Sequence, residues 1–202
     1  MQLPYYIDLL GTLVFAISGS LAASGKNMYR DIFAVTFIGF VTAVGGGSLR
    51  DLILNTRPVW VADGNYLLAV TLGVMSSILF RYYFLKFRRT LFLFDTIGIA
   101  LYTVVGVQKS LMFGVSPAAA IVLGMFSAVM GGVLRDTLTN EIPVIFQKEI
   151  YATACLSGAA LFIILQFIGV NSNINAFLSV ILIITVRIFA VKNHWTLPKV
   201  GK

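Results

Sequence analysis

Two stretches of the chain repeat each other and decide how its fold is interpreted: VGGGSLRD at residues 44–51 and MGGVLRD at residues 130–136. Aligning residues 45–60 with residues 130–145 needs no gap and gives eight identical positions of sixteen. These include both glycine pairs, the Arg-Asp pair and the asparagine and proline after it: Gly46/Gly131, Gly47/Gly132, Arg50/Arg135, Asp51/Asp136, Asn55/Asn140 and Pro58/Pro143. The pattern predicts two copies of one structural unit.

A second pair of matching blocks lies upstream of each glycine motif. DLLGTLVFAISG, from Asp8, matches DTIGIALYTVVG, from Asp95, in its acid and in the glycines three and eleven positions later. The two pairs of blocks align together when two residues are gapped between them. The repeat therefore covers most of the chain.

The composition predicts a membrane protein. Of 202 residues, 58% are hydrophobic and 11% are charged, and the mean hydropathy is +0.92. A soluble domain carries about 25% charged residues, so this chain cannot cover itself with a polar surface. In a membrane protein, the lysines and arginines behind the net charge of +7 are assigned to one side of the membrane or the other. The positive charge therefore does not indicate nucleic-acid binding. The single cysteine, Cys155, excludes an intrachain disulfide.

The apolar runs predict an all-α protein with seven transmembrane helices in one domain, residues 1–202. A spanning helix needs roughly 20 apolar residues. The expected spans are about 5–23, 32–56, 65–85, 91–109, 117–140, 149–169 and 174–191, the second and fifth interrupted at their glycines. Repeat 1 covers about 5–85, repeat 2 about 91–169, and helix 7 about 174–191 is additional. Each repeat has an odd number of spans, which predicts an inverted 3+3 repeat.

The positive charges predict the orientation. One side collects twelve cations, namely Lys26, Arg30, Arg81, Lys86, Arg88, Arg89, Arg135, Lys148, Arg187, Lys192, Lys199 and Lys202, and the other side collects Arg50, Arg57 and Lys109. The positive-inside rule then places the N-terminus outside and the C-terminal tail, 192–202, in the cytoplasm. Arg187, near the end of helix 7, is expected to snorkel to the interface.

The glycine motifs allow two interpretations. Small residues permit close helix packing, whereas a kink or partial unwinding would expose carbonyls that need water, protein or an ion. The kink interpretation makes a cation pathway of Gly45, Gly46, Gly47, Ser48, Gly131 and Gly132.

The charged residues beside the glycines also allow two interpretations. Arg50 and Arg135 could lie at the two interfaces, or they could be buried with Asp51 and Asp136, since an ionisable group in a membrane tends to be paired. Asp8 and Asp95 lie inside their spans and are candidate partners for the arginines. Gln108 and Lys109 close the fourth helix and are candidates for a pore mouth. We expect no metal site and no enzyme activity, because the chain has one histidine and lacks a phosphate-binding loop.

The double Gly-Gly-x-x-Arg-Asp motif, the 3+3+1 arrangement and the chain length resemble the prokaryotic TRIC (trimeric intracellular cation) channels, a family with bacterial members described as glycine transporters. The resemblance implies a homotrimer with one pore per protomer, lined by the kinked helices 2 and 5, that conducts monovalent cations, chiefly potassium. No cofactor is implied beyond potassium or sodium ions and bound lipid. Two other classes stay open from the residues: a secondary transporter of a small amino acid such as glycine, and a structural protein with no pathway.

Overall fold

The computed structural model describes residues 3–25, 31–86, 89–147 and 150–196, and within these ranges the regular structure is entirely helical. The elements in chain order are α1 (Leu3–Ser24), α2 (Ile32–Ile53), α3 (Val59–Ala62), α4 (Asn65–Leu79), α5 (Arg81–Lys86), α6 (Thr90–Met112), α7 (Pro117–Leu138), the 3-10 turn η1 (Val144–Phe146), α8 (Ala152–Phe167) and α9 (Ser172–Lys192). The predicted all-helical class is confirmed.

Seven of these helices lie where the sequence predicts spans. Five described helices, α1, α2, α6, α7 and α9, are long and apolar enough to cross a membrane. Helices α4 and α8 are apolar but shorter, with 15 and 16 residues. The third predicted span is divided at Phe80, where α4 ends and the short α5 follows.

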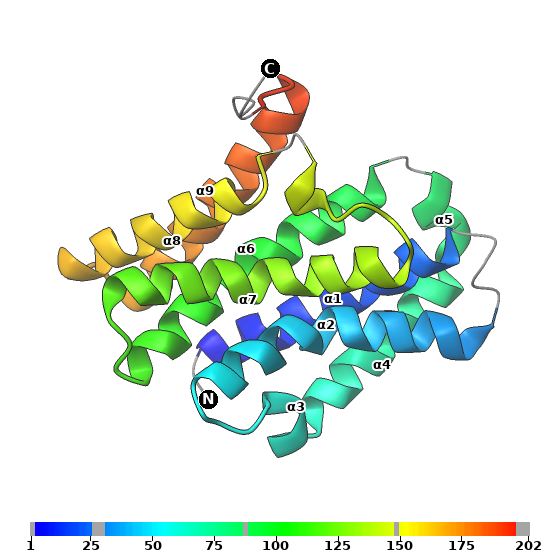
Figure 1. The fold of residues 1–202 in the computed structure, drawn as a ribbon, viewed down its shortest axis with the longest axis horizontal. Helices are drawn as coiled ribbons and strands as arrows, with labels where there is room; N and C mark the ends of the chain where they lie inside the picture. The colour runs from blue at the N-terminus through cyan, green and yellow to red at the C-terminus, as the bar shows by residue number, and fades with distance from the viewer. Residues whose placement is uncertain (1–2, 26–30, 87–88, 148–149, 197–202) are drawn as a thin grey trace.

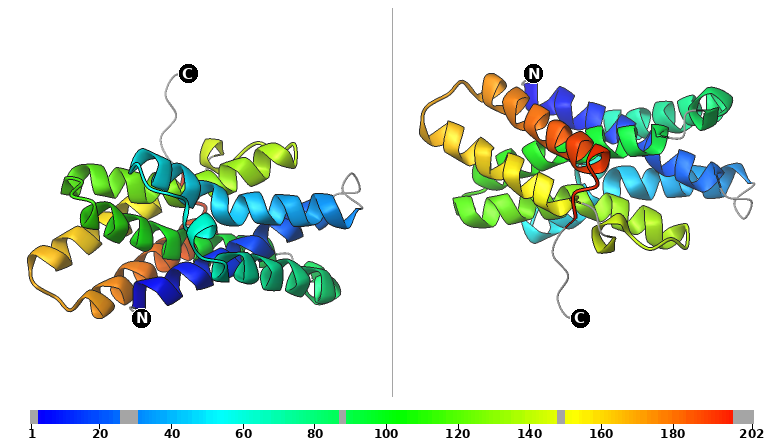
Figure 2. Two further views of the ribbon diagram at one scale, coloured as in Figure 1. Left: turned by 90° about the horizontal axis from the view of Figure 1, so that it is seen from below. Right: turned by 90° about the horizontal axis from the view of Figure 1, so that it is seen from above.

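Four long helices form the centre of the molecule (Figure 1). Helices α1 and α2 pack together, α6 and α7 pack together, and these two pairs join through α1 against α6 and α2 against α7. Helix α4 packs on α1, whereas α8 packs on α7 and α9 packs on both α8 and α6. Figure 2 shows the consequence: α8 and α9 lie at one side of the central four helices and α4 and α5 lie at another.

The end of α2 and the end of α7 have the same local geometry, which the sequence motif explains. Asn55 and Asn140 each have φ 54°, a left-handed conformation that asparagine tolerates and that ends a helix. The backbone N–H one residue later bonds back to the aspartate carbonyl in both cases, Thr56 to Asp51 and Glu141 to Asp136, each at 2.8 Å. The matched asparagines are therefore helix terminators.

The glycine runs do not interrupt their helices, and the expected interruption is wrong. Helix α2 is α-helical through Gly45–Gly47, and α7 is α-helical through Gly131–Gly132. Instead, the glycines bring the two backbones together. A Cβ on Gly46 would overlap the carbonyl oxygen of Ser127, and a Cβ on Gly131 would lie 2.5 Å from the Thr42 carbonyl oxygen. Close packing between α2 and α7 therefore explains why these two positions have no side chain.

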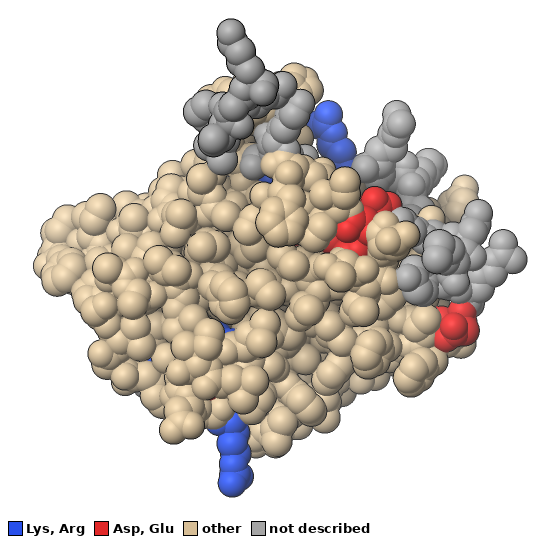
Figure 3. Space-filling model, viewed as in Figure 1, with Lys and Arg blue, Asp and Glu red and all other residues tan. Residues whose placement is uncertain are grey.

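The outer surface is apolar over most of its area, as a lipid-facing surface requires. Figure 3 shows that charged side chains cover little of the face in view and are most prominent toward its margins. Large apolar side chains are exposed on several helices, including Phe33 on α2, Leu68 on α4, Phe167 on α8 and Phe177 on α9. Six of the cations used to predict orientation, Lys26, Arg30, Arg88, Lys148, Lys199 and Lys202, lie outside the described residues, as does the end of the predicted tail.

Candidate functional site

Two groups of buried charges lie at opposite ends of the central helices. The first charge cluster consists of Asp8, Arg50, Asp51 and Lys109, and the second charge cluster consists of Asp95, Arg135, Asp136 and Arg187. Helix α6 runs from Asp95 in the second cluster to Lys109 in the first, a distance along the helix of about 21 Å. Each cluster contains two acids and two bases, so each has a formal charge of zero.

The first charge cluster is centred on Asp51. Its Oδ1 accepts from Arg50 Nε at 2.8 Å and from Lys109 Nζ at 2.8 Å. Arg50 and Asp51 have no exposed side-chain surface, whereas the Lys109 side chain is 20% exposed. Burial excludes the interpretation that Arg50 snorkels to the interface.

Asp8 has a different partner from the one expected. Its Oδ2 accepts from the Tyr66 hydroxyl at 2.9 Å, and within the described part of the chain its buried Oδ1 has no hydrogen-bond partner. The described contacts include no ion pair between Asp8 and Arg50, so this predicted pair is wrong as a direct contact. Tyr66, near the start of α4, lies beside the Asp8 carboxylate in the place where Arg50 was expected.

The second charge cluster is more fully connected. Arg135 donates from Nη1 to Asp95 at 2.6 Å and to the Ser18 hydroxyl at 2.8 Å, and from Nε to Asp136 at 2.8 Å. The predicted pairing of Arg135 with Asp95 is confirmed. The Arg135 side chain is 2% exposed, so it is buried with its carboxylates as Arg50 is.

Asp51 and Asp136 each join a helix end to the loop that follows it. Besides the neighbouring arginine, each carboxylate accepts the backbone N–H eight residues later through Oδ2, from Val59 and from Val144, both at 3.1 Å. A carboxylate with an arginine and a backbone donor is well compensated for burial. These two aspartates therefore position both the arginines and the returning loops.

An aromatic pair separates the two charge clusters. Phe15 of α1 and Tyr102 of α6 are buried, and their ring centroids lie 5.1 Å apart. The Tyr102 hydroxyl donates to the Ala43 carbonyl oxygen at 2.8 Å and lies 2.8 Å from the Thr12 hydroxyl. The pair therefore fills the centre of the four helices and ties α6 to α1 and α2.

The third glycine of the first motif and its counterpart lie against side chains of neighbouring residues. A Cβ on Gly47 would lie 3.5 Å from Tyr102 Cε1 and 3.8 Å from Arg50 Nη2. A Cβ on Gly132 would lie 2.7 Å from the Tyr151 hydroxyl and 3.7 Å from Arg135 Nη2. These glycines therefore face the tyrosines and the arginines, whereas Gly46 and Gly131 face backbone.

The other predicted site residues are dispersed. Ser48 accepts from Trp60 Nε1 at 3.0 Å and so holds the α3 segment. A Cβ on Gly45 would lie 2.5 Å from Leu134 Cδ1 of α7. Gln108 donates to the Ser172 hydroxyl at 3.4 Å, whereas Lys109 contacts Asp51, and α6 continues past both residues to Met112. Lys109 alone of this predicted pair belongs to a charge cluster.

Four aromatic residues of the site were missed by the sequence analysis, and the repeat contained the signal. Phe15 and Tyr102 occupy the same position in the two upstream blocks, and Tyr66 and Tyr151 follow the two motif aspartates at the same distance. The Tyr151 hydroxyl contacts Asp95 Oδ1 at 3.4 Å, as Tyr66 contacts Asp8. Aligning the aromatic positions as well as the glycines and charges would have found them.

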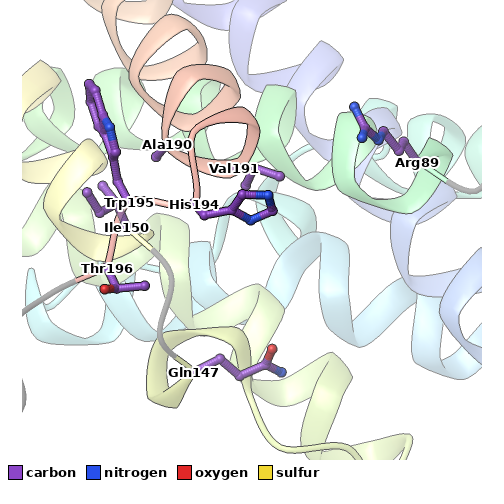
Figure 4. Close-up of a pocket in the computed structure, with 8 residues that line it drawn as sticks. All are labelled: Arg89, Gln147, Ile150, Ala190, Val191, His194, Trp195 and Thr196. Atoms are coloured by element: carbon purple, nitrogen blue, oxygen red, sulfur yellow. The ribbon is translucent and has the colours of Figure 1, made fainter.

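A separate pocket of about 450 Å³ lies beside the C-terminal end of α9 (Figure 4). Its lining is Arg89, Gln147, Ile150, Ala190, Val191, His194, Trp195 and Thr196. His194 is exposed there. The described residues contain no group of His, Cys, Asp or Glu that could hold a metal ion.

Comparison with known proteins assigns the class. A family model described as "Glycine transporter" matches residues 5–82 and 92–166. A UPF0126 membrane protein of Vibrio cholerae is 36% identical over 199 residues, which cover 98% of this chain and 82% of the relative. The UPF0126 inner membrane protein YadS of Escherichia coli is 36% identical over 200 residues, which cover 98% of this chain and 96% of the relative.

Comparison with solved structures assigns the same class. A trimeric intracellular cation (TRIC) channel orthologue from Rhodobacter sphaeroides superposes with a TM-score of 0.89 at 33% identity, covering 96% of this chain and all of that one. A structure of a TRIC cation channel superposes with a TM-score of 0.84 at 30% identity, covering 100% and 98% of the two chains. The protein is thus an all-helical membrane protein with the TRIC channel fold. The chain belongs to the prokaryotic TRIC family, and the predicted resemblance is confirmed.

Proposed function

We propose that this protein is a monovalent cation channel, chiefly for potassium, that forms a homotrimer with one pathway in each protomer. The observation that carries the proposal is the pair of buried charge clusters at opposite ends of the central helices of a single chain. An ionisable group inside a membrane is expensive and typically marks an ion or substrate pathway. Each cluster is neutral within a single chain and its acids contact bases or hydroxyls of that chain, which supports a separate pathway in each subunit.

The proposed pathway runs among α1, α2, α6 and α7, from one charge cluster to the other. Carboxylate, hydroxyl and carbonyl oxygens face this route, and oxygen dipoles can replace part of a cation's hydration shell. In this proposal Gly47 and Gly132 widen the route beside Arg50 and Arg135, and the Phe15–Tyr102 pair is its narrowest part. Gly46 and Gly131 allow the backbones of α2 and α7, two of the four helices around the route, to pack directly against each other.

The architecture behind the pathway is an inverted repeat of three spans with a seventh added. Matching contacts support it: each motif aspartate binds its arginine at 2.8 Å and a loop N–H at 3.1 Å. The clusters also lie at opposite ends of α6, as an inverted repeat requires. The shorter α4 and α8 are the third span of each repeat.

We further propose a multi-pass location in the cell membrane, with the N-terminus outside and the C-terminus in the cytoplasm. The excess of lysine and arginine at the predicted inner ends supports this orientation. In that orientation the first charge cluster faces outward and the second faces the cytoplasm. The Escherichia coli relative is named as an inner membrane protein, which agrees with the proposed location in the cell membrane. Potassium or sodium ions and lipid are the proposed ligands.

A second candidate is a transporter of a small amino acid such as glycine. The specific observation in its favour is the description of the family model that matches the chain. An aromatic barrier between two charged ends is also what alternating access around a central site would use. The two functions differ in what crosses the membrane and in whether crossing saturates.

Potassium and glycine flux across liposome membranes separates the two candidates. Purified protein in potassium-loaded vesicles should release potassium rapidly down its gradient, and glycine outside should leave the rate unchanged. The matched control is the same preparation carrying Asp51→Asn, which should release potassium more slowly. Saturable uptake of labelled glycine without potassium release would contradict the channel and support the transporter.

A further inference from the structure

Helix α9 lies outside the repeat, yet it contributes a buried charge to the second charge cluster. Arg187 is 1% exposed, so the prediction that it snorkels to the interface is wrong. It lies one and a half turns before the end of α9 at Lys192, in a helix whose apolar character would suit a simple lipid-facing span. Burying a guanidinium in a membrane-spanning helix is costly unless a carboxylate or a carbonyl oxygen compensates its charge.

Two segments, α6 and the residues just before α8, hold the Arg187 guanidinium. Its central carbon lies 5.0 Å from the Phe92 ring centroid and 4.7 Å from the Tyr151 ring centroid. Nη1 donates to the Ile150 carbonyl oxygen at 3.1 Å, and Nη2 lies 3.9 Å from Asp95 Oδ2. A planar cation between two aromatic faces is fixed in position and orientation. The charge of α9 is thereby directed at Asp95.

The charge balance shows what this contact does. Without Arg187, the second charge cluster would contain Asp95 and Asp136 against Arg135 alone, a net charge of minus one. With Arg187, the cluster is neutral, and each oxygen of Asp95 faces a different guanidinium, Oδ1 at Arg135 and Oδ2 at Arg187. Asp95 is therefore both neutralised and fixed between two arginines.

We propose that Arg187 is a positioning residue that clamps Asp95 and cancels its charge, so that the seventh helix limits cation passage through the second charge cluster. This inference rests on the proposed channel function. In the wild type, an approaching cation meets a neutral cluster, and loss of the Arg187 charge would leave a net negative one. Low-dielectric walls concentrate the field of such a charge on the pathway.

The test measures potassium conductance and reversal potential for R187Q, R187K and the control K192Q in planar bilayers. R187Q should raise potassium conductance at least about twofold and shift the reversal potential toward stronger cation preference. R187K keeps the charge and should stay near wild type. K192Q removes the same charge from the exposed end of α9 and should change neither quantity.

A charge-compensation pair distinguishes the clamp from a merely structural role. D95N should lower potassium conductance, because the cluster becomes net positive, and D95N/R187Q should return it toward wild type. The double variant leaves no unpaired charge, so it carries the test even where R187Q alone does not assemble. Conductance in the double variant lower than in D95N would overturn the inference, as would an unchanged reversal potential in R187Q. Absence of current in the wild type would instead overturn the channel itself.

Discussion

Single carboxylates join helices to loops in this protein, and their bonds explain why each arginine tolerates burial. Asp51 and Asp136 each hold an arginine with one oxygen and a backbone N–H with the other. The sequence offered buried Arg-Asp pairs as one of two interpretations, the other being arginines at the membrane interfaces. It could not predict that Tyr66 takes the place of Arg50 at Asp8, because that contact depends on how α4 packs against α1.

Neutralising either motif aspartate should destabilise the protein strongly. Asp51→Asn leaves the buried Arg50 without the carboxylate it contacts, and Asp136→Asn removes one of the two carboxylates at Arg135 and leaves Asp95. Breaking a buried ion pair costs about 3–5 kcal/mol. The matched control is Asp63→Asn. Asp63 is outside the spans, and its pKa is lowered by hydrogen bonds from the Asn65 backbone N–H and the Tyr5 hydroxyl. These hydrogen bonds lie near the surface, so Asp63→Asn should change stability much less than either buried variant.

Thermal unfolding in mild detergent measures all three aspartate variants. Equal melting temperatures for Asp51→Asn, Asp136→Asn and Asp63→Asn would show that the two buried pairs contribute no more than a surface contact. The buried arginines would then have to be compensated by other groups.

Shortening Tyr102 should open the centre of the proposed pathway. Tyr102→Ala removes the ring between the two charge clusters and should increase potassium conductance, at a cost to stability of about 3–5 kcal/mol for a buried aromatic. Tyr102→Phe keeps the ring but leaves the Ala43 carbonyl oxygen without its donor, which costs about 1–3 kcal/mol. The control is Phe80→Ala, at an exposed ring. Single-channel conductance equal in Tyr102→Ala and wild type would exclude the aromatic pair as the constriction.

At the scale of helices, α2 and α7 are held together by backbone contact at their glycines. The sequence predicted the positions at which the helices meet, because the glycines recur at the same place in each repeat. It could not decide between kinking and packing, since both need small residues. The answer depends on the neighbouring backbone: Gly46 faces the Ser127 carbonyl and Gly131 faces the Thr42 carbonyl.

Alanine substitutions distinguish the glycines that pack from those that make room. Gly46→Ala should push α2 away from α7 and cost about 1–3 kcal/mol, as overpacking does. Gly47→Ala should be close to neutral, because its Cβ would lie 3.5 Å from Tyr102 Cε1, an ordinary contact distance. Melting temperatures of the two variants provide the comparison. A Gly46→Ala protein as stable as Gly47→Ala would contradict the packing role.

At the scale of the whole molecule, the sequence predicted the helix order and the two charged ends but not how the seventh helix is used. Helix spans follow from apolar length, and the ends of α6 and α7 lie within three residues of their expected positions. Arg187 illustrates what local sequence cannot show. Near a helix end a long cation normally reaches the interface, and only the packing of α9 against α6 turns this one inward.

The assembly should be a trimer. The motivation is the family, with its trimeric orthologue from Rhodobacter sphaeroides, and the apolar surface that the single chain exposes. Native mass spectrometry of the protein in mild detergent should give three chains per particle. A stable monomer or dimer with bound lipid retained would contradict the proposed assembly, while the pathway within each protomer would still require its own test.

The central claim is that each protomer conducts cations between its two charge clusters, and single-channel recording of purified protein tests it most directly. In a planar bilayer with a potassium gradient, we predict unitary currents whose reversal potential lies between zero and the potassium equilibrium potential. Up to three equal conductance levels should appear for each assembly, and Asp51→Asn should reduce them. Purified trimers that give no unitary current, while reconstituted vesicles from the same preparation accumulate glycine, would contradict the claim.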